Sequence, residues 1–150
     1  MNIKSLIGSG DKIMGITLPF AIIGIVLNVF YPQWFKMNIG NTGIIIGIIL
    51  LVVGVPLWLT AVFQMVKFVP QNMLITKCAF KIMLHPIYTA VALLVIPGVS
   101  FLFDTWVGFA IGIILYVISR IFRGQEERKL DDVFMEEYRT YRSKVILKWI

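Results

Sequence analysis

Three groups of polar side chains in this chain have types that can bind a charged ligand or move a proton. The only histidine, His85, begins a His-Pro-Ile-Tyr stretch directly before a long apolar run. A pair of adjacent carboxylates, Glu126 and Glu127, follows the next apolar run, and Tyr138 and Tyr141 come after it. An imidazole changes its charge near neutral pH, and a carboxylate accepts hydrogen bonds from cations and hydroxyls. Together these residues could form one binding site.

Each group also has a purely structural interpretation. Proline is common at the first position of a helix, so Pro86 could simply start one and leave His85 at the interface. A glutamate pair among many charges is often a solvated helix face, and tyrosines often only pack. What favours a shared site is their joint occurrence, with one apolar helix and a short linker between them.

The composition shows what surrounds these polar groups. Hydrophobic residues make up 59% of the 150 residues and charged residues 15%. Soluble domains average about 45–50% apolar and about 25% charged residues. A globule of this size cannot hide so much apolar surface from water. We therefore expect lipid to solvate much of the chain.

Four apolar runs contain no charged residue, and a helix needs about 20 such residues to cross a bilayer. The runs are Ile13–Phe30, Gly43–Val62, Ile87–Phe103 and Trp106–Ser119. Only Asp104 and its neighbour separate the last two, which predicts a helical hairpin with a tight turn. The fourth run has 14 residues and spans only if Arg120 snorkels to the interface. The sequence thus predicts an all-α integral membrane protein with four transmembrane helices.

The distribution of Lys and Arg predicts the orientation. With four helices, the N-terminus, segment 63–86 and the C-terminus lie on one side of the membrane. That side carries thirteen of the fourteen basic residues, and the other side carries only Lys36. Since cytoplasmic loops are enriched in Lys and Arg, we expect both termini in the cytoplasm.

We interpret residues 1–150 as a single membrane domain. Residues 1–62 are expected to form an N-terminal helical hairpin, and residues 63–86 a cytoplasmic loop along the interface. Residues 120–150 are expected to form a cytoplasmic amphipathic helix, with Glu126 and Glu127 beside its buried edge. Its apolar positions, spaced by three or four, are Leu130, Val133, Phe134, Tyr138, Tyr141 and Val145.

Composition also limits the partners. One cysteine and one histidine permit no internal disulfide and no cysteine-based metal site, so no metal is expected. We interpret the net charge of +6 as a determinant of topology and of contact with anionic membrane lipids, not with nucleic acid. Gly43 and Gly47 form a GxxxG pair, for which we expect close packing within the bundle. A monomer and a homodimer both remain possible.

The order of these motifs resembles one family of membrane enzymes. His-Pro-x-Tyr is followed by an apolar hairpin, Glu-Glu-x-x-Leu, and then Phe-x-x-x-Tyr-x-x-Tyr-x-x-x-Val. This is similar to the isoprenylcysteine carboxyl methyltransferase and phospholipid methyltransferase family. The resemblance runs from Leu74 to Trp149, whereas residues 1–62 match only as generic apolar helices.

The resemblance implies an S-adenosylmethionine-dependent methyltransferase whose cofactor-binding half is 63–150. It implies a lipophilic methyl acceptor that enters between the helices, such as an isoprenylcysteine-like carboxylate, a lipid amine or a thiol. The implied catalytic residues are Glu127 and Tyr141. The implied cofactor-binding residues are Phe80, Leu84, His85, Pro86, Tyr88 and Glu126.

The chain departs from the family pattern at four places. Cys78-Ala-Phe80 replaces the usual Gly-Pro-Tyr, and Leu84 replaces the usual arginine before His-Pro. Phe134-Met135 replaces the usual Phe-Gly, and Val145-Ile146 replaces the usual Val-Pro. The first two changes fall in the stretch that the family wraps around its cofactor.

Two other functions are compatible with the sequence. A membrane reductase of the sterol-reductase type, which uses NADPH, has a similar helical arrangement and its own His-Pro-x-Tyr. A non-catalytic membrane paralogue would account for the lost Gly-Pro and arginine. The reductases lack the Glu-Glu-x-x-Leu element that is present here.

Overall fold

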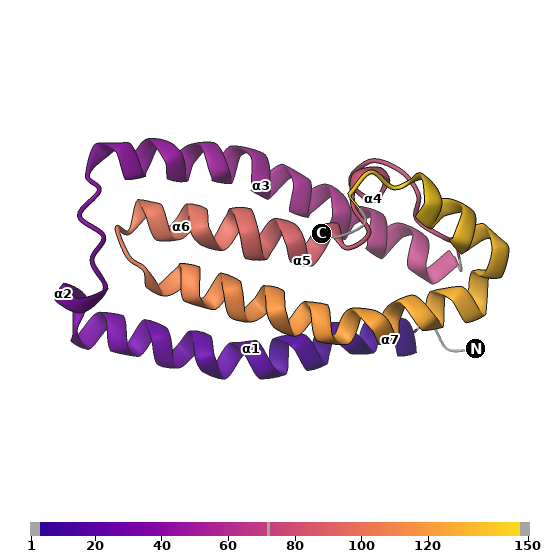
Figure 1. Ribbon diagram of the computed structural model, residues 1–150, viewed down its shortest axis with the longest axis horizontal. Coiled ribbons are helices and arrows are strands. Elements are labelled where there is room, and N and C mark those ends of the chain that lie inside the picture. The colour runs from indigo at the N-terminus through magenta and orange to yellow at the C-terminus, as the bar shows by residue number, and fades with distance from the viewer. Residues whose placement is uncertain (1–3, 72, 148–150) are drawn as a thin grey trace.

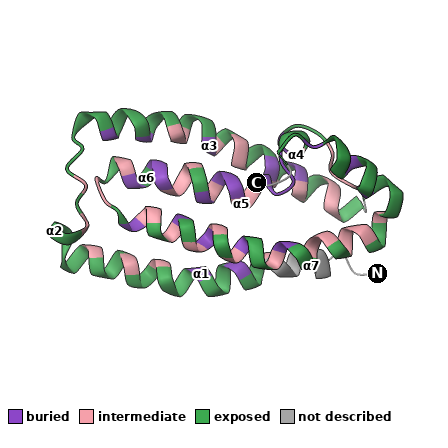
Figure 2. Cartoon of the chain, viewed as in Figure 1, coloured by how far each residue is buried: buried purple, intermediate pink, exposed green. Residues whose placement is uncertain are grey.

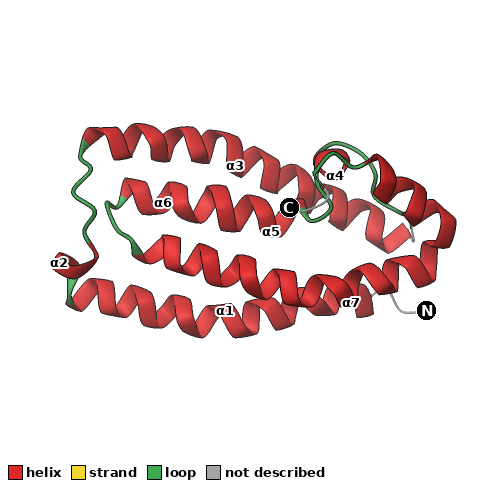
Figure 3. Cartoon of the chain, in the orientation of Figure 1, coloured by secondary structure: helices red, strands yellow, loops and turns green. Residues whose placement is uncertain are grey.

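The computed structural model describes residues 4–71 and 73–147, and every element within these ranges is a helix (Figure 3). The elements are α1 (Lys4–Phe30), α2 (Pro32–Phe35), α3 (Asn41–Phe68), a 3₁₀ turn η1 (Val69–Gln71), α4 (Ala79–Ile82), α5 (Pro86–Ala90), a π-helical turn η2 (Val91–Val95), α6 (Ile96–Leu102) and α7 (Val107–Lys144). The all-helical prediction is confirmed for the described residues. The last part of the predicted amphipathic segment, 148–150, lies outside them.

Within the described residues, three segments are long and apolar enough to cross a membrane, so the predicted count of four spans is not confirmed. The three segments are Gly10–Phe30, Asn41–Gln71 and Val107–Lys144. The third predicted run instead forms the shorter apolar helix Pro86–Leu102, which α5, η2 and α6 build together. By length and composition, the described residues therefore fit a membrane protein with three clear spans.

The long helices lie side by side in the order α3, α5–α6, α7 and α1 (Figure 1). α1 packs against α7, and α3 packs against α5, η2 and α6. The expected N-terminal hairpin of residues 1–62 therefore does not pack on itself, because the second hairpin lies between its two helices. The segment that contains α2 connects α1 to α3 across the end of the second hairpin (Figure 1).

The outer helices keep their apolar side chains at the surface (Figure 2). On α1, Phe20, Ile23 and Val29 are all more than half exposed, and on α3 so are Val52 and Phe63. Exposed apolar surface of this extent is expected when lipid tails, not water, surround a helix.

Small residues allow α3 to approach α6 closely. A Cβ atom on Gly47 would lie 2.8 Å from the carbonyl oxygen of Gly98, and one on Gly54 would lie 2.6 Å from Leu94 Cβ. Both positions exclude any larger side chain. The GxxxG pair that Gly47 ends thus serves packing within the chain, as expected.

The third helix is interrupted by the wider turn η2. Pro97 follows this turn and cannot donate a hydrogen bond to a carbonyl one turn earlier, and its ring crowds that turn. A π-helical turn gives the backbone the extra room that it needs there.

The turn at Asp104 was predicted and is present. The Asp104 carboxylate accepts hydrogen bonds from the backbone N–H groups of Asn38 and Ile39, both at 3.2 Å. Thr105 donates a 2.8 Å bond to the Asn28 side chain at the same end. These contacts tie the α6–α7 turn to the loop that follows α2 and to the last turn of α1.

α7 corrects the expectation of a separate amphipathic helix over 120–150. The helix is continuous from Val107 past Glu127 and turns at Met135, whose φ of 43° and ψ of −117° are not helical. The loop expected over 63–86 is also shorter, because α3 continues to Phe68 and α4 forms within it. The carboxylate pair is therefore held on a rigid extension of a membrane-type helix.

Candidate functional site

His85 is placed by the start of α5. Pro86 occupies the first helical position, where its missing N–H costs nothing and its fixed φ suits a helix. His85 precedes it with an extended φ of −127°, and its carbonyl accepts a 3.2 Å bond from Thr89 N–H. The side chain is 7% exposed, so the imidazole points into the protein. The interfacial interpretation of His85 does not fit this burial.

The imidazole lies between the two carboxylates that the sequence singled out. His85 Nδ1 is 3.5 Å from Glu126 Oε2, and Nε2 is 3.5 Å from Glu127 Oε1. The glutamate side chains are 18% and 15% exposed, so both are largely shielded from water. The structure therefore brings together three of the predicted site residues. Glu126 and Glu127 come from α7, and His85 directly precedes α5.

These carboxylates change the charge state of the histidine. Burial lowers the pKa of His85, but the side chains of Glu126 and Glu127 raise it more, so the pKa lies above its ordinary value. The positive charge of Arg123 opposes this rise. The two carboxylates thus favour the protonated form of His85.

Two arginines complete the electrostatics, and the sequence analysis missed both. Arg142 Nη2 lies 3.0 Å from Glu127 Oε2, and Arg123 is buried on α7 one turn before the glutamates. The spacing of Arg123 to Glu126 and Glu127, three and four residues, is a detectable helical signal. Arg142 has no comparable spacing to Glu127 in the sequence. The two side chains meet only because α7 turns at Met135.

A hydrophobic cluster includes Leu84, the residue before His85. Leu84, Tyr138, Tyr141 and Val145 are buried together. The Tyr141 hydroxyl donates a 2.7 Å hydrogen bond to the backbone carbonyl of Phe80. Tyr141, expected to be catalytic, thus uses its hydroxyl in this structure to hold α4 against the end of α7.

Tyr88 belongs to a different cluster. It packs with Ile13, Ala92 and Leu115, and its hydroxyl is near Gly10 at the start of the apolar part of α1. α1 therefore contributes a wall beside Tyr88, although residues 1–62 carried no motif. The two aromatic residues predicted to bind the cofactor therefore lie in different clusters. Phe80 packs with Leu84 and Tyr141, and Tyr88 packs with Ile13.

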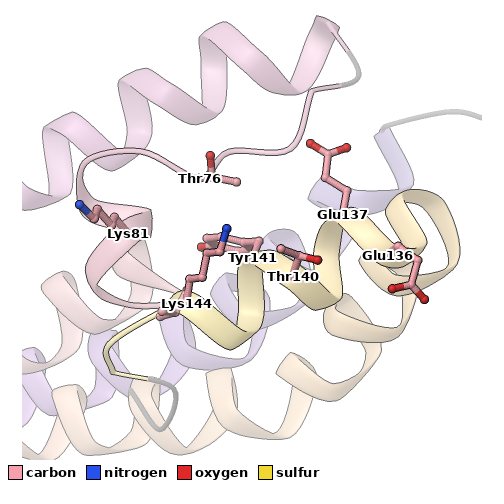
Figure 4. A pocket seen from close by; sticks show the side chains of 8 residues that line it. Thr76, Lys81, Glu136, Glu137, Thr140, Tyr141 and Lys144 are labelled. Atoms are coloured by element: carbon pink, nitrogen blue, oxygen red, sulfur yellow. The ribbon is translucent and has the colours of Figure 1, made fainter.

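A cavity of about 500 Å³ opens between the segment before α4 and the last turns of α7 (Figure 4). Its lining residues are Thr76, Lys81, Glu136, Glu137, Thr140, Tyr141, Lys144 and Val145. Tyr141 and Val145 also pack in the cluster with Leu84, the residue before His85. The cavity thus adjoins the histidine site through this cluster but is not lined by His85, Glu126 or Glu127.

Both segments that face this cavity begin at a residue with positive φ. Cys78 has φ 51° and ψ −120°, and Met135 has φ 43° and ψ −117°. Only glycine adopts this region readily, because a Cβ atom clashes with the backbone there. The two residues precede α4 and the last part of α7, so both walls begin at a strained position.

Searches against family models and characterised proteins, and of the structure against solved structures, found no match. The resemblance described above therefore remains a prediction. Across residues 4–71 and 73–147, no three His, Cys, Asp or Glu side chains gather closely enough to hold a metal ion.

Proposed function

We propose that this protein is an integral membrane methyltransferase that uses S-adenosylmethionine and acts on a lipophilic acceptor. The observation that carries the proposal is the buried His85, held between Glu126 and Glu127 at one end of the apolar helices. His85 and Glu126, which are 41 positions apart in the sequence, meet there, as the resemblance requires. A structural helix start has no need of a buried histidine with two carboxylates.

The membrane arrangement is part of the proposal. We propose that Pro86–Leu102 crosses the membrane as a fourth span, because 17 apolar residues reach the lower limit for a hydrocarbon core. The end of the molecule that holds α4 and the last turns of α7 carries most of the basic residues (Figure 1). We infer that this end, with both termini, faces the cytoplasm.

The donor set of the site fits the cofactor. S-adenosylmethionine carries a carboxylate, an ammonium, ribose hydroxyls and a sulfonium, and it supplies an activated methyl group when bound. His85 Nε2 is buried 3.5 Å from Glu127 Oε1 without a hydrogen bond of good geometry, and we propose that its proton is shared with the cofactor carboxylate when the cofactor binds. Glu126 and Glu127 retain acceptor oxygens for an ammonium or a hydroxyl. Phe80 and Tyr88 have aromatic faces that attract a cation.

The chain itself contributes position and the exclusion of water. Methyl transfer to an aligned nucleophile is an in-line displacement, and alignment alone can lower the barrier by about 7–11 kcal/mol. We propose that Glu127 accepts the proton of an amine acceptor, whereas a carboxylate or thiolate acceptor needs no base. Few polar residues are therefore sufficient for this reaction.

The backbone at Cys78 and Met135 supports the family resemblance independently. Both have the φ and ψ that glycine prefers, and both stand where that family usually has glycine. A chain that follows the family's path but has lost its glycines would have strain at these two positions. No other interpretation of the sequence singled out both positions.

The test is transfer of radiolabelled methyl groups from S-adenosylmethionine to lipid. Membranes that contain the protein should incorporate label into the organic-extractable fraction, and the His85→Ala variant should lose most of it. NADPH oxidation without label transfer would instead support a reductase. Equal labelling by His85→Ala and wild type would contradict the proposed site.

A further inference from the structure

Gln64 on α3 is a buried polar residue without a role in the site proposed above. The buried residues of α3 form one stripe along the helix: Gly43, Gly47, Gly54, Ala61 and Gln64. All but the last are small. Gln64 is 8% exposed, and it is the only polar side chain in this buried set.

The packing of this stripe places Gln64 near the start of α5. Gly47 contacts Gly98, and Gly54 contacts Leu94, so α3 runs antiparallel to the third helix. Extended toward the end of α3, the same pairing brings Ala61 and Gln64 level with the first turn of α5. α3 also packs directly against α5 and α4. Gln64 thus lies at the level of His85.

Three polar atoms in this region are buried and make no hydrogen bond to any described residue. They are Gln64 Oε1, Thr89 Oγ1 and His85 Nε2. Thr89 N–H donates a 3.2 Å hydrogen bond to the His85 carbonyl, so Thr89 lies about one helical turn further along α5 than His85. Buried polar atoms are almost always paired in a native protein. Two buried oxygens without a donor therefore indicate a place for a ligand that supplies one.

We propose that Gln64 and Thr89 bind the polar head of a lipophilic ligand that carries an N–H or O–H group. An amide and a hydroxyl have no charge, so they match an uncharged donor, whereas His85, Glu126 and Glu127 match charged groups. Gln64 lies at the level of His85 and Thr89 one turn further along α5, so a ligand that arrives from the lipid could reach both from between the helices. This rests on the proposed function, in which that ligand is the methyl acceptor.

The experiment compares Gln64→Leu with Gln71→Leu in the purified, detergent-solubilised protein. Gln71 lies in η1 and is exposed, so it provides a matched control for the same chemical change. The probe is a total lipid extract of membranes in mixed micelles. The first readout is the rise in melting temperature that this extract produces. The second is the dissociation constant for S-adenosylhomocysteine.

We expect the extract to stabilise wild type and Gln71→Leu equally, and to stabilise Gln64→Leu by less than half as much. The extract concentration for half-maximal stabilisation should rise about tenfold in Gln64→Leu, as for a lost buried hydrogen bond. S-adenosylhomocysteine affinity should stay within about twofold of wild type, because the site for charged groups is intact.

The two proposals fail in different ways. If the extract stabilises Gln64→Leu as much as wild type, or stabilises neither, the assignment of Gln64 is wrong. If wild type fails to bind S-adenosylhomocysteine while the lipid effect still depends on Gln64, the methyltransferase proposal fails and the binding assignment stands. Without the extract, Gln64→Leu should melt at the same temperature or higher, which would show that the variant folds.

Discussion

The hydroxyl of Tyr141 donates a 2.7 Å hydrogen bond to the carbonyl of Phe80, across 61 positions of the chain. This bond fastens the last part of α7 to α4. Both segments begin at a residue with positive φ, Met135 in one case and Cys78 in the other. One side chain thus holds together the two walls that flank the cavity beside the histidine site.

Removing this hydroxyl should loosen the walls without removing a reacting group. We expect Tyr141→Phe to lower the free energy of unfolding by about 1 kcal/mol, since the Phe80 carbonyl loses its donor. If the variant is active, its KM for the cofactor should rise more than its kcat falls. Tyr31→Phe, an exposed tyrosine at the other end, is the control. A selective loss of kcat in Tyr141→Phe would instead restore a catalytic role for this hydroxyl.

Glycine should be preferred at both strained positions. A non-glycine residue in this region costs about 1–3 kcal/mol, and glycine costs about 0.5–1 kcal/mol through the unfolded chain. We therefore expect Cys78→Gly and Met135→Gly each to stabilise the protein by about 1 kcal/mol in thermal denaturation. Thr140→Gly, at an exposed helical position in α7, should destabilise it by about the same amount. Destabilisation in all three variants would show that the backbone is not strained at Cys78 and Met135.

Stability should depend on pH through His85. Its folded pKa is raised above the ordinary 6.5, so the folded state binds this proton more tightly than the unfolded state. The resulting stability is fully present below pH 6.5 and is lost as the pH rises through the folded pKa. In His85→Gln, the fall in melting temperature over this interval should be reduced. Parallel profiles for the two proteins would show that another group titrates.

The far end of the molecule should be independent of the site. Asp104 accepts two backbone hydrogen bonds from the loop at Asn38 and Ile39. Asp104 has a positive φ of 50°, which asparagine also tolerates, and the two side chains have the same shape. Asp104→Asn removes the charge that strengthens these two hydrogen bonds, so we expect the free energy of unfolding to fall by about 1 kcal/mol. Binding of S-adenosylhomocysteine should not change. A parallel loss of binding would show that the two ends are coupled.

Much of the helix pattern could be predicted because apolar runs and the tight turn at Asp104 are local signals. The meeting of His85 with Glu126 and Glu127 was also predictable, since each lies next to a helix on the same side. The order of the helices was not. Insertion of α5–α6 and α7 between α1 and α3 depends on how their surfaces fit, and similar apolar runs do not encode a choice of neighbour.

Features that depend on backbone geometry were also missed. The turn at Met135 has no proline or glycine to signal it, so residues 120–150 read as one amphipathic helix. Because that turn brings Arg142 back to Glu127, the ion pair could not be predicted either. Gln64 was overlooked because one glutamine near the end of an apolar run has the spacing of an interfacial residue.

The account rests on a cofactor site at His85, Glu126 and Glu127. Calorimetric titration of the purified protein with S-adenosylhomocysteine tests it most directly, with Glu126→Gln and Glu127→Gln beside Glu136→Gln. Glu136 is 85% exposed and pairs with Arg139, so its variant controls for loss of one carboxylate. We predict saturable binding by wild type and Glu136→Gln, and affinity about tenfold weaker or worse in the other two. No heat of binding at millimolar ligand, or equal affinity in all four proteins, would contradict the account.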